Sequence, residues 1–492
     1  MELFFRGHDY KYAVEQILLT LFPEERPVYP AAPTGADSAS VSLHCGARFV
    51  TAATVLRIGG QRCAGQARVE RSALDGGAVV SERLRQRIIK QSFYRAGVRC
   101  LGKKPVWGAL SGIRPAKLLR NLLDAEPDEQ RACRRFMEIY DVSPERTALT
   151  LDAARCAAAV QTALAPRDVC LYLGVPFCPT RCAYCSFVSQ SVERSLALID
   201  PFVQALERDI SATAAAAREN GLRVIAVYFG GGTPTTLTAE QLDRVIDRMQ
   251  REFDLSACRE FTVEAGRPDT ITPEKLDVLV RRGVTRISVN PQTMRDEVLR
   301  AIGRRHTAED VRRALELVRA AGPLQVNMDL IAGLPEDTPA GFAQTLTEVL
   351  ALGAENITVH TLALKKGSRI MLEGTRLPGA AEVGEMLDMA QSALRGRGYA
   401  PYYLYRQKFM SGGFENVGWC LPGTENLYNI CIMEELCSIF AMGAGGSTKL
   451  VRGDGRLSRF FAPKYPQEYI SGIEKVCADK EQITRFYQGG TL

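Results

Sequence analysis

The chain has 492 residues, of which 46% are hydrophobic and 24% are charged. These values are typical of a globular protein that is too long for one ordinary core. Its 62 basic and 56 acidic residues leave a net charge of +6 that looks diffuse along the sequence, which argues against a nucleic-acid-binding protein. No apolar run is long enough to predict a membrane span, and the first 23 residues mix charged and apolar side chains, unlike a secretory signal. We therefore expect a cytoplasmic protein of several domains.

Residues 1–150 are expected to form a separate α+β domain, whose role the sequence does not indicate. Runs that are typical of strands occur at 1–6, 40–45 and 47–57, and helical runs occur at 12–21, 81–96 and 115–123. Residues 28–38 have the composition of a loop.

From about 165 to 380, short β-rich runs alternate with amphipathic helical stretches. The predicted strands are 169–175, 223–229, 259–265, 284–290, 324–331 and 356–362, and the predicted helices are 195–220, 239–253, 273–282, 308–321 and 339–352. Right-handed βα crossovers would curl such a parallel sheet. We therefore predict the α/β class and a partial (β/α)6 barrel of the TIM type.

Residues 381–492 are expected to form a mainly helical or mixed domain that covers the substrate. A helix is predicted at 381–395 and another near 433–440. Between them lies a tyrosine-rich segment, YAPYYLYRQKF.

Three of the 14 cysteines stand apart from the rest. Cys178, Cys182 and Cys185 form a C-x3-C-x2-C triplet directly after the first predicted barrel strand, whereas the other cysteines are scattered. We expect most of the others to be reduced and buried, because a disulfide framework is typical of small secreted chains. No histidine lies close to the triplet in sequence, so a zinc site is the weaker interpretation. Three thiolates can hold three irons of a 4Fe–4S cluster and leave the fourth iron open.

Glycines and polar residues follow the other predicted strands, and in α/β barrels the chemistry sits at these carboxyl ends. The relevant stretches are YFGGGTPT, TVEAGRPD, RISVNPQTM, AIGRRHT, VNMDLIAGLP and VHTLALKKGSR. A single residue of this kind is often only a cap or a turn partner. Six successive strand ends with such groups on one rim favour a ligand site.

These motifs together resemble radical S-adenosylmethionine (SAM) enzymes of the oxygen-independent coproporphyrinogen III dehydrogenase family. The family includes HemN-like and HemW-like proteins, and the resemblance is greatest to its HemZ branch. It covers roughly residues 165–450, and the segment WGALSGIRPAKL at 107–118 is also similar to that branch. The motifs that carry it are PFCPTRCAYCSF, YFGGGTPT, FTVEAGRPD, RISVNPQTM, GRRH, MDLIAGLP, ITVHTLALKKGS and AMGAGGSTK.

The resemblance implies that Cys178, Cys182 and Cys185 ligate a 4Fe–4S cluster, whose open iron binds SAM and whose electron yields a 5′-deoxyadenosyl radical. The SAM bound to the cluster would meet Tyr172, Gly231 and Glu264. Where a second SAM binds, the matching positions are Tyr184, Gly232, Thr233, Gln292, Arg304, Asp329 and Ala363. No residue is singled out as a catalytic acid or base.

The implied reaction converts two propionates of coproporphyrinogen III to vinyl groups and gives protoporphyrinogen IX for haem biosynthesis. A low-potential electron donor, flavodoxin-like or ferredoxin-like, is the implied partner. The tetrapyrrole carries four carboxylates on an apolar macrocycle, so its site needs cations and aromatic rings. The candidates are Arg305, Lys365, Lys366, Arg369, Arg406 and Lys408, with Tyr402, Tyr403 and Tyr405. For each cation, the alternative is an ordinary solvated surface residue.

Two departures from the family pattern leave the substrate open. Phe187 stands where well-described dehydrogenases have a fourth cysteine, and Gly174 stands where they have a histidine soon after the first-strand tyrosine.

The first alternative function is a haem chaperone without decarboxylase activity. Its H-N-x-x-Y-W motif corresponds here to ENLYNI, which lacks the histidine, and Cys420 and Cys431 are the remaining soft candidate ligands. The second alternative is another radical enzyme of tetrapyrroles, such as one that methylates and opens haem anaerobically. The third is an RNA-modifying radical enzyme.

Overall fold

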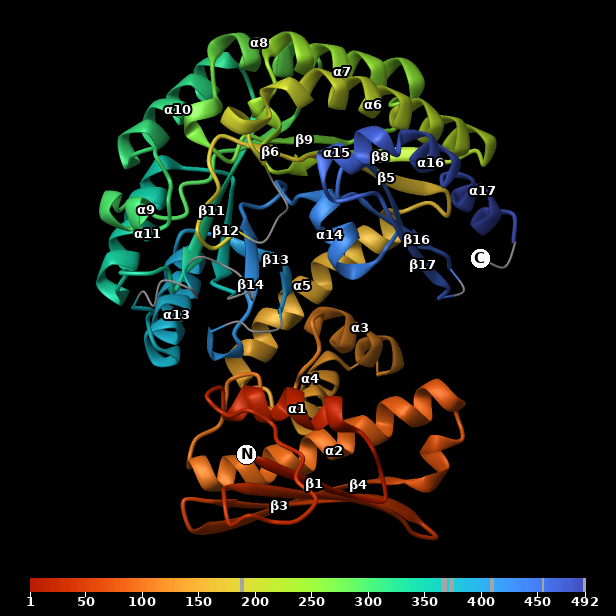
Figure 1. The fold of residues 1–492 in the computed structure, drawn as a ribbon, viewed down its shortest axis with the longest axis vertical. Helices are drawn as coiled ribbons and strands as arrows, with labels where there is room; N and C mark the ends of the chain where they lie inside the picture. The colour runs from red at the N-terminus through yellow and green to blue at the C-terminus, as the bar shows by residue number, and fades with distance from the viewer. Residues whose placement is uncertain are drawn as a thin grey trace. The chain divides into compact units, whose positions relative to one another are not determined.

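The computed structural model describes residues 1–126, 128–185, 190–363, 370, 376–407, 411–453 and 455–489. The chain divides into two compact units, Met1–Leu151 and Asp152–Leu492, which are shown in Figure 1. No helix among the described residues has the length and apolar character that crossing a membrane requires.

The first unit is a four-stranded sheet with helices packed on it. Its strands lie in the order β1 (Glu2–Arg6), β2 (Ser38–Cys45), β3 (Phe49–Ile58) and β4 (Gln61–Glu70). β1 and β2 are parallel, and the other pairs are antiparallel. The helices are α1 (Lys11–Leu21), α2 (Ala78–Leu101), α3 (Pro115–Ala125) and α4 (Glu129–Tyr140), and α5 (Pro144–Ala163) runs on into the second unit.

Strand β4 was not predicted, because its sequence QRCAGQARVE buries few apolar side chains. Its buried residues are the small Gly65 and Ala67. A Cβ added at Gly65 would lie 2.2 Å from the carbonyl oxygen of Ser92 on α2. The close approach of a helix, and not apolar periodicity, therefore explains the composition of this strand.

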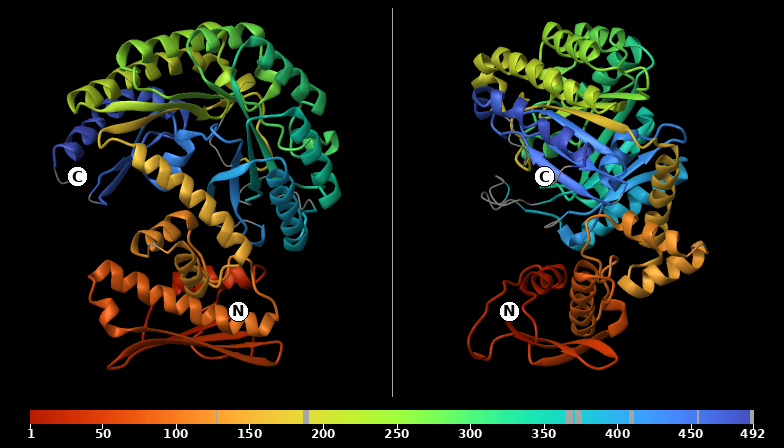
Figure 2. Two further views of the ribbon diagram at one scale, coloured as in Figure 1. Left: turned by 180° about the vertical axis from the view of Figure 1, so that it is seen from behind. Right: turned by 90° about the vertical axis from the view of Figure 1, so that its right-hand side faces the viewer.

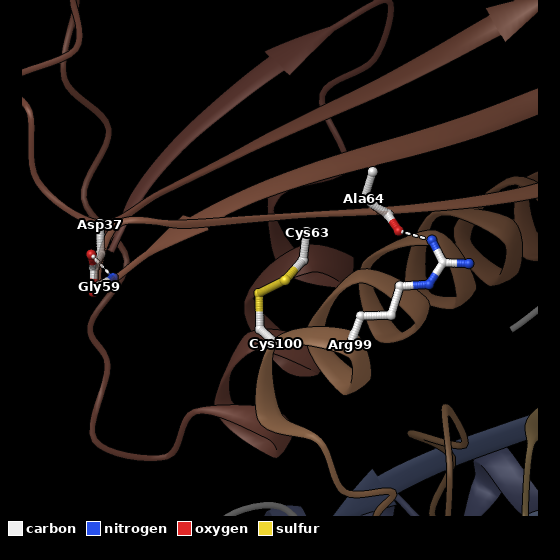
Figure 3. The surroundings of a disulfide bond; sticks show 6 residues. All are labelled: Asp37, Gly59, Cys63, Ala64, Arg99 and Cys100. Carbon is white, nitrogen blue, oxygen red and sulfur yellow. Dashed lines mark hydrogen bonds between the residues drawn. A yellow bond between two sulfur atoms is a disulfide. The ribbon is translucent and has the colours of Figure 1, made fainter.

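One disulfide is present among the described cysteines, and it is an exception to the expected reduced state. It joins Cys63 on β4 to Cys100 near the end of α2, as Figure 3 shows. Beside it, the Arg99 side chain donates a hydrogen bond to the carbonyl oxygen of Ala64. These links fasten the end of the long helix to the sheet edge.

The second unit is built on an eleven-stranded sheet, whose centre is six parallel strands in sequence order. They are β5 (Asp168–Val175), β8 (Arg223–Gly231), β9 (Glu260–Glu264), β10 (Arg286–Ser288), β11 (Gln325–Ala332) and β12 (Asn356–Thr361). They coincide with the six predicted strands within a few residues at each end. The sheet order is β13-β14-β12-β11-β10-β9-β8-β5-β15-β16-β17. Among the described residues β13 and β17 pair with only one neighbour each, so the barrel is partial, as predicted.

Helices follow the strands and cover the convex side of this sheet (Figures 1 and 2). They are α6 (Val192–Glu219), α7 (Ala239–Glu252), α8 (Pro273–Arg281), α9 (Asp296–Ala301), α10 (Ala308–Ala321) and α11 (Pro339–Leu352). Thr238, Thr272, Thr307 and Thr338 cap α7, α8, α10 and α11 with their side-chain oxygens. Three short 3-10 turns, Pro234–Thr236, Pro268–Thr270 and Ser411–Gly413, lie in the connections.

Residues after 380 extend the same sheet. They form α13 (Ala380–Gly396), β13 (Ala400–Tyr405), β14 (Asn416–Cys420), α14 (Leu427–Glu434), β15 (Ser438–Gly443), β16 (Ser447–Val451) and β17 (Leu457–Phe461), followed by α15 (Pro466–Ser471), α16 (Ile473–Ala478) and α17 (Glu481–Tyr487). β15 lies parallel to β5, and β14 is antiparallel to β12. The helix expected at 433–440 is wrong after Glu434, where α14 ends, and residues 438–440 lie in β15. A short apolar run does not distinguish a buried strand from a helix.

Candidate functional site

The three cysteines of the triplet lie at the start of a segment whose two ends are joined by a short two-stranded sheet. β5 leads into the short strand β6 (Phe177–Cys178), which pairs with β7 (Gln190–Ser191) on the far side of the loop. Cys182 and Cys185 are linked by a backbone hydrogen bond of 3.1 Å, and Ala183 N donates to Ile302 O at 2.9 Å. None of the three cysteines is in a disulfide, and all are half-buried. The three thiols are therefore outside any disulfide, and backbone hydrogen bonds anchor the loop that carries them.

The glycine-rich end of β8 packs directly against the first cysteine. Gly232 N donates to Val175 O at 2.7 Å, and Thr233 N donates to Phe177 O at 2.7 Å. A Cβ added at Gly232 would lie 2.4 Å from Phe177 O and 3.0 Å from Cys178 Sγ. The Thr233 hydroxyl lies 3.6 Å from the same sulfur. A larger residue at Gly232 would therefore clash with this turn, and the turn places a hydroxyl donor beside Cys178.

Tyr184 and Arg304 fix the second half of the loop. The Arg304 guanidinium donates to Asn290 O at 2.6 Å, to Gly266 O at 3.2 Å and to the Tyr184 hydroxyl at 3.3 Å. The Tyr184 ring packs on an apolar cluster that includes Ile302. Arg304 is buried, and its Nε has no hydrogen-bond partner in the described part of the chain. A buried cation with an unused donor suits an anionic or carbonyl group of a ligand.

Glu264, at the end of β9, lies among tyrosines and has a raised pKa. It accepts a hydrogen bond from the Tyr228 hydroxyl, and the Tyr228 and Tyr172 rings are stacked 6.4 Å apart. Removal from water raises the pKa of Glu264 to about 7; the charge of Asp329 adds to this, while the Tyr228 hydrogen bond opposes it. This carboxyl group therefore changes charge near neutral pH and is suited to pairing with a cationic ligand.

Asp329 on β11 contacts polar side chains from β11, from β12 and from the segment that follows β10. Asn290 and Asn327 each donate to it at 2.8 Å, and His360 Nε2 lies 3.7 Å from its Oδ2. Burial opposes ionisation, but the interactions with His360 and Asn327 outweigh it and lower the pKa of Asp329. Asp329 therefore stays ionised at neutral pH.

Gln292 has an unusual backbone conformation at the rim. Its φ is +67°, which few residues other than glycine adopt. Backbone hydrogen bonds to both sides of Leu330 hold it: Gln292 N donates to Asp329 O at 2.9 Å, and Ile331 N donates to Gln292 O at 3.0 Å. Such backbone geometry is common at ligand sites.

The remaining predicted residues have varied surroundings. Tyr172 lies on β5, and Gly231 ends β8 next to Gly230, where an added Cβ would lie 3.1 Å from Tyr172 Cε2 and 3.2 Å from Glu264 Oε2. Ala363, partly buried, follows the end of β12. Arg305 is exposed, whereas Arg406 is buried and donates to Gly413 O at 3.1 Å. Tyr402 and Tyr403 are buried and Tyr405 is partly exposed. Lys365, Lys366, Arg369, Lys408 and Phe187 lie outside the described residues.

Sequence reasoning did not single out His360, Asn327 and Tyr228 as members of this site. Asn327 and Asp329 alternate along β11, and Tyr228 pairs in register with Tyr172 across β5 and β8. The period of two along a strand was the signal that could have identified Asn327. The pairing of Tyr228 with Tyr172 depends on register, which a single sequence does not reveal.

Comparisons with known proteins give a consistent result. Residues 172–349 match the family model of the Radical SAM superfamily. The oxygen-independent coproporphyrinogen-III oxidase-like protein HemZ of Bacillus subtilis is 40% identical over 380 residues, which cover 76% of each chain. The heme chaperone HemW of Bacillus subtilis is 32% identical over 250 residues, which cover 50% of this chain and 64% of that protein.

A solved structure has the same fold. Coproporphyrinogen III oxidase (HemN) from Escherichia coli, described as a radical SAM enzyme, aligns with a TM-score of 0.52 at 23% identity. The alignment covers 65% of this chain and 72% of that one. At this level of identity the likeness shows the fold alone.

Proposed function

This chain belongs to the radical SAM superfamily, in the family of coproporphyrinogen-oxidase-like proteins, and from this premise we propose that it oxidatively decarboxylates the propionates of coproporphyrinogen III. The cofactors of the superfamily are a 4Fe–4S cluster and SAM. When bound, they supply a 5′-deoxyadenosyl radical that removes a hydrogen atom from an unactivated carbon. The protein itself supplies position, charge and the exclusion of water.

The observation that carries the proposal is the packing of the glycine turn of β8 against Cys178. It brings the Thr233 hydroxyl to the first of three non-disulfide cysteines and leaves no space for a side chain at Gly232. Cys178, Cys182 and Cys185 would hold the cluster. Glu264, at the end of the neighbouring strand, has a pKa raised to about 7 and would pair with a sulfonium or ammonium group in its ionised form.

Tyr184 and Arg304 support the same assignment from the other side of the loop. Arg304 has a buried Nε without a partner among the described residues and lies against Tyr184, between the second and third cysteines. We assign this donor to a polar group of the bound cofactor. Glu264, Tyr184 and Arg304 would then orient SAM around the cluster loop.

For the tetrapyrrole, Asp329 on β11 and His360 on β12 are partly exposed polar residues, and the side chain of Arg305 is an exposed cation. His360 is held at 3.7 Å from Asp329 and is partly exposed on this face. A side chain at Gly174 would meet Ala444 O at 3.1 Å and Tyr172 Cε1 at 3.2 Å. Gly174 therefore has little space for a side chain, and we propose His360 as a polar group that the tetrapyrrole meets.

For each propionate carboxylate, one hydrogen atom would pass to the 5′-deoxyadenosyl radical and one electron to an external one-electron acceptor, while carbon dioxide leaves and a vinyl group remains. The test is anaerobic reconstitution followed by incubation with coproporphyrinogen III, SAM and a low-potential reductant. Mass spectrometry should show stepwise loss of carbon dioxide and hydrogen from two side chains. Addition of a methyl group, or an unchanged tetrapyrrole with a fully loaded cluster, would refute the proposed substrate reaction.

A matched pair of variants controls this test. Cys182→Ser should remove the cluster and the products together. Cys258→Ser, a half-buried cysteine whose thiol donates to Glu260 O at 3.2 Å, should leave both intact because serine can donate the same hydrogen bond. A parallel titration with haemin tests the chaperone function of the HemW relatives. Tight haem binding without decarboxylation would favour that function instead.

A further inference from the structure

A second group of cysteines lies at the other end of β5, away from the cofactor loop. The thiols of Cys170, Cys431 and Cys437, here called the buried thiol cluster, all lie within 4.8 Å of one another, and all three residues are buried. The sulfurs of Cys170 and Cys437 are 3.6 Å apart. Cys437 is 267 positions from Cys170 and 6 positions from Cys431 in sequence, so spacing gave no sign of the group.

Each of the three thiols is fixed by a well-anchored element. Cys170 lies on β5, in register with Ile439 of β15 on one side and Ala226 of β8 on the other. Cys431 lies on α14, whose first turn is capped by Asn426 and by Glu260, which accepts from Leu427 N at 2.8 Å. The chain then turns through Glu435, at φ +56°, to reach Cys437 just before β15. Ligands held in this way lose little freedom when an ion binds.

The surroundings of the cluster are apolar and aromatic. Ile225, Ala226, Ile439 and Tyr428 pack around the three cysteines. The Tyr428 ring stacks on Tyr172 at 6.2 Å and on Tyr228 at 4.5 Å. These rings lie between the buried thiol cluster and Glu264, so water and the cofactor site are both kept away from the sulfurs.

The donor set selects the chemistry of the ion. Three sulfurs without oxygen ligands exclude calcium and magnesium. Thiolates favour soft ions such as Cu(I) or zinc, but a closed zinc site takes four ligands. In the part of the chain that the structure describes, no fourth histidine, cysteine or carboxylate joins this group. A three-coordinate soft ion therefore fits better than zinc.

We propose that Cys170, Cys431 and Cys437 form a three-sulfur binding site for a soft monovalent metal ion of the Cu(I) type, separate from the iron–sulfur site. The site lies about 16 Å along β5 from Val175, taking about 3.3 Å per strand residue. An ion there would link β5, α14 and the start of β15, and it would therefore stabilise the folded state of this unit. The site does not depend on the proposed decarboxylation.

The test uses the full chain carrying Cys178→Ala, Cys182→Ala and Cys185→Ala, which removes the iron–sulfur ligands. Under anaerobic conditions this protein is titrated with Cu(I) in competition with a chromophoric chelator. We expect one tightly bound equivalent per chain, three sulfur neighbours in the copper X-ray absorption spectrum, and an increase in thermal midpoint on binding. A tenfold excess of zinc should not displace the ion.

Further variants in the same background locate the ion. Cys431→Ser and, separately, Cys437→Ser should each lose the tight equivalent and the thermal shift, while Cys258→Ser should keep both. Circular dichroism and the melting curve without metal establish that each variant is folded, and Cys170→Ser replaces any that is not. Retention of the tight equivalent in both folded variants, two or four ligands in the absorption spectrum, or displacement by zinc would overturn the proposal.

Discussion

The two ends of β5 carry cysteines in opposite settings. At its carboxyl end, Cys178, Cys182 and Cys185 lie within eight residues on a half-buried loop. Near its amino end, the buried thiol cluster brings Cys170 of β5 together with Cys431 and Cys437 of the distant α14–β15 segment in an apolar core. The thiols of the first group are partly exposed to solvent, whereas those of the second group are buried. If both proposals hold, the same residue type would serve reaction chemistry at one end of a strand and metal binding in the core at the other.

Neighbouring polar groups differ in the same way. Around the cofactor loop, Tyr172, Glu264 and Asp329 stay partly exposed, and Arg304 keeps an unused donor. At the other end, both oxygens of the buried Glu260 accept backbone hydrogen bonds from the first turn of α14, and Arg286 lies 3.7 Å away. The carboxylates therefore differ between the two ends, although the buried Nε of Arg286, like that of Arg304, has no hydrogen-bond partner among the described residues.

The largest effect is expected at the cofactor loop. Cys182→Ser should abolish both the cluster absorbance and SAM cleavage, because serine is a poor ligand for iron in such clusters. Cys437→Ser should retain both, since its thiol lies in the buried thiol cluster. Iron and sulfide analysis, together with 5′-deoxyadenosine release, provides the measurement. Loss of iron in both variants would show that the two ends are not independent.

A large loss of folding stability is expected from Glu260→Ala, at the amino end of β9. The change leaves Arg286 buried beside no carboxylate and removes the acceptor of Leu427 N and Tyr428 N. Breaking a buried pair in this way costs about 3–5 kcal/mol. Urea denaturation should show the loss, and Glu297→Ala, at an exposed ion pair with Arg295, should cost under about 1 kcal/mol. Equal costs for the two variants would contradict this assignment.

Gly232→Ala should weaken the cofactor loop without unfolding the protein. The added methyl would meet Phe177 O at 2.4 Å and Cys178 Sγ at 3.0 Å, so the first ligand must move. We expect cluster or SAM occupancy to fall by about tenfold or more, which is the usual range for a displaced metal-site support. Gly396→Ala, a helical position with no atom within 4 Å, is the matched control and should behave as the parent protein.

The smallest predicted effect is a pH dependence. The pKa of Glu264 is raised to about 7, mainly by removal from water, so its ionised fraction increases from about one tenth at pH 6 to about nine tenths at pH 8. If the carboxylate pairs with a cationic part of SAM, affinity should increase up to about tenfold over this range. Isothermal titration should show this increase in the parent and a flat profile in Glu264→Gln. Identical profiles would remove Glu264 from the SAM site.

The net charge of +6 for the whole chain does not show how charge is divided between the two units. Residues 1–151 contain 23 basic and 16 acidic residues, whereas residues 152–492 contain 39 and 40. The excess of positive charge therefore lies in the first unit. The sequence appeared diffuse in charge because the balanced second unit is more than twice as long.

The parallel core was predictable because its signals are local. Each of the six strands is a short β-rich run, and threonine caps and glycine stops mark the helices between them. The triplet and the glycine motif are local as well. The sequence therefore predicted the barrel strands and placed the cysteines at their carboxyl rim.

What could not be predicted depends on register and long-range contact. β15 joins the sheet beside β5 although more than 260 residues separate them, and its run SIFAMG has no periodicity that distinguishes strand from helix. The buried thiol cluster follows directly from this pairing. His360 was likewise a lone histidine in sequence, and it became part of the site only through its distance to Asp329.

The most direct test measures the molar ratio of the two expected products, 5′-deoxyadenosine and vinyl groups. In anaerobically reconstituted protein supplied with SAM, reductant and coproporphyrinogen III, 5′-deoxyadenosine and new vinyl groups are measured in the same samples over time. The account predicts that they form in a ratio close to one and that both disappear in Cys182→Ser. Release of 5′-deoxyadenosine with no vinyl group formed from this substrate would contradict it.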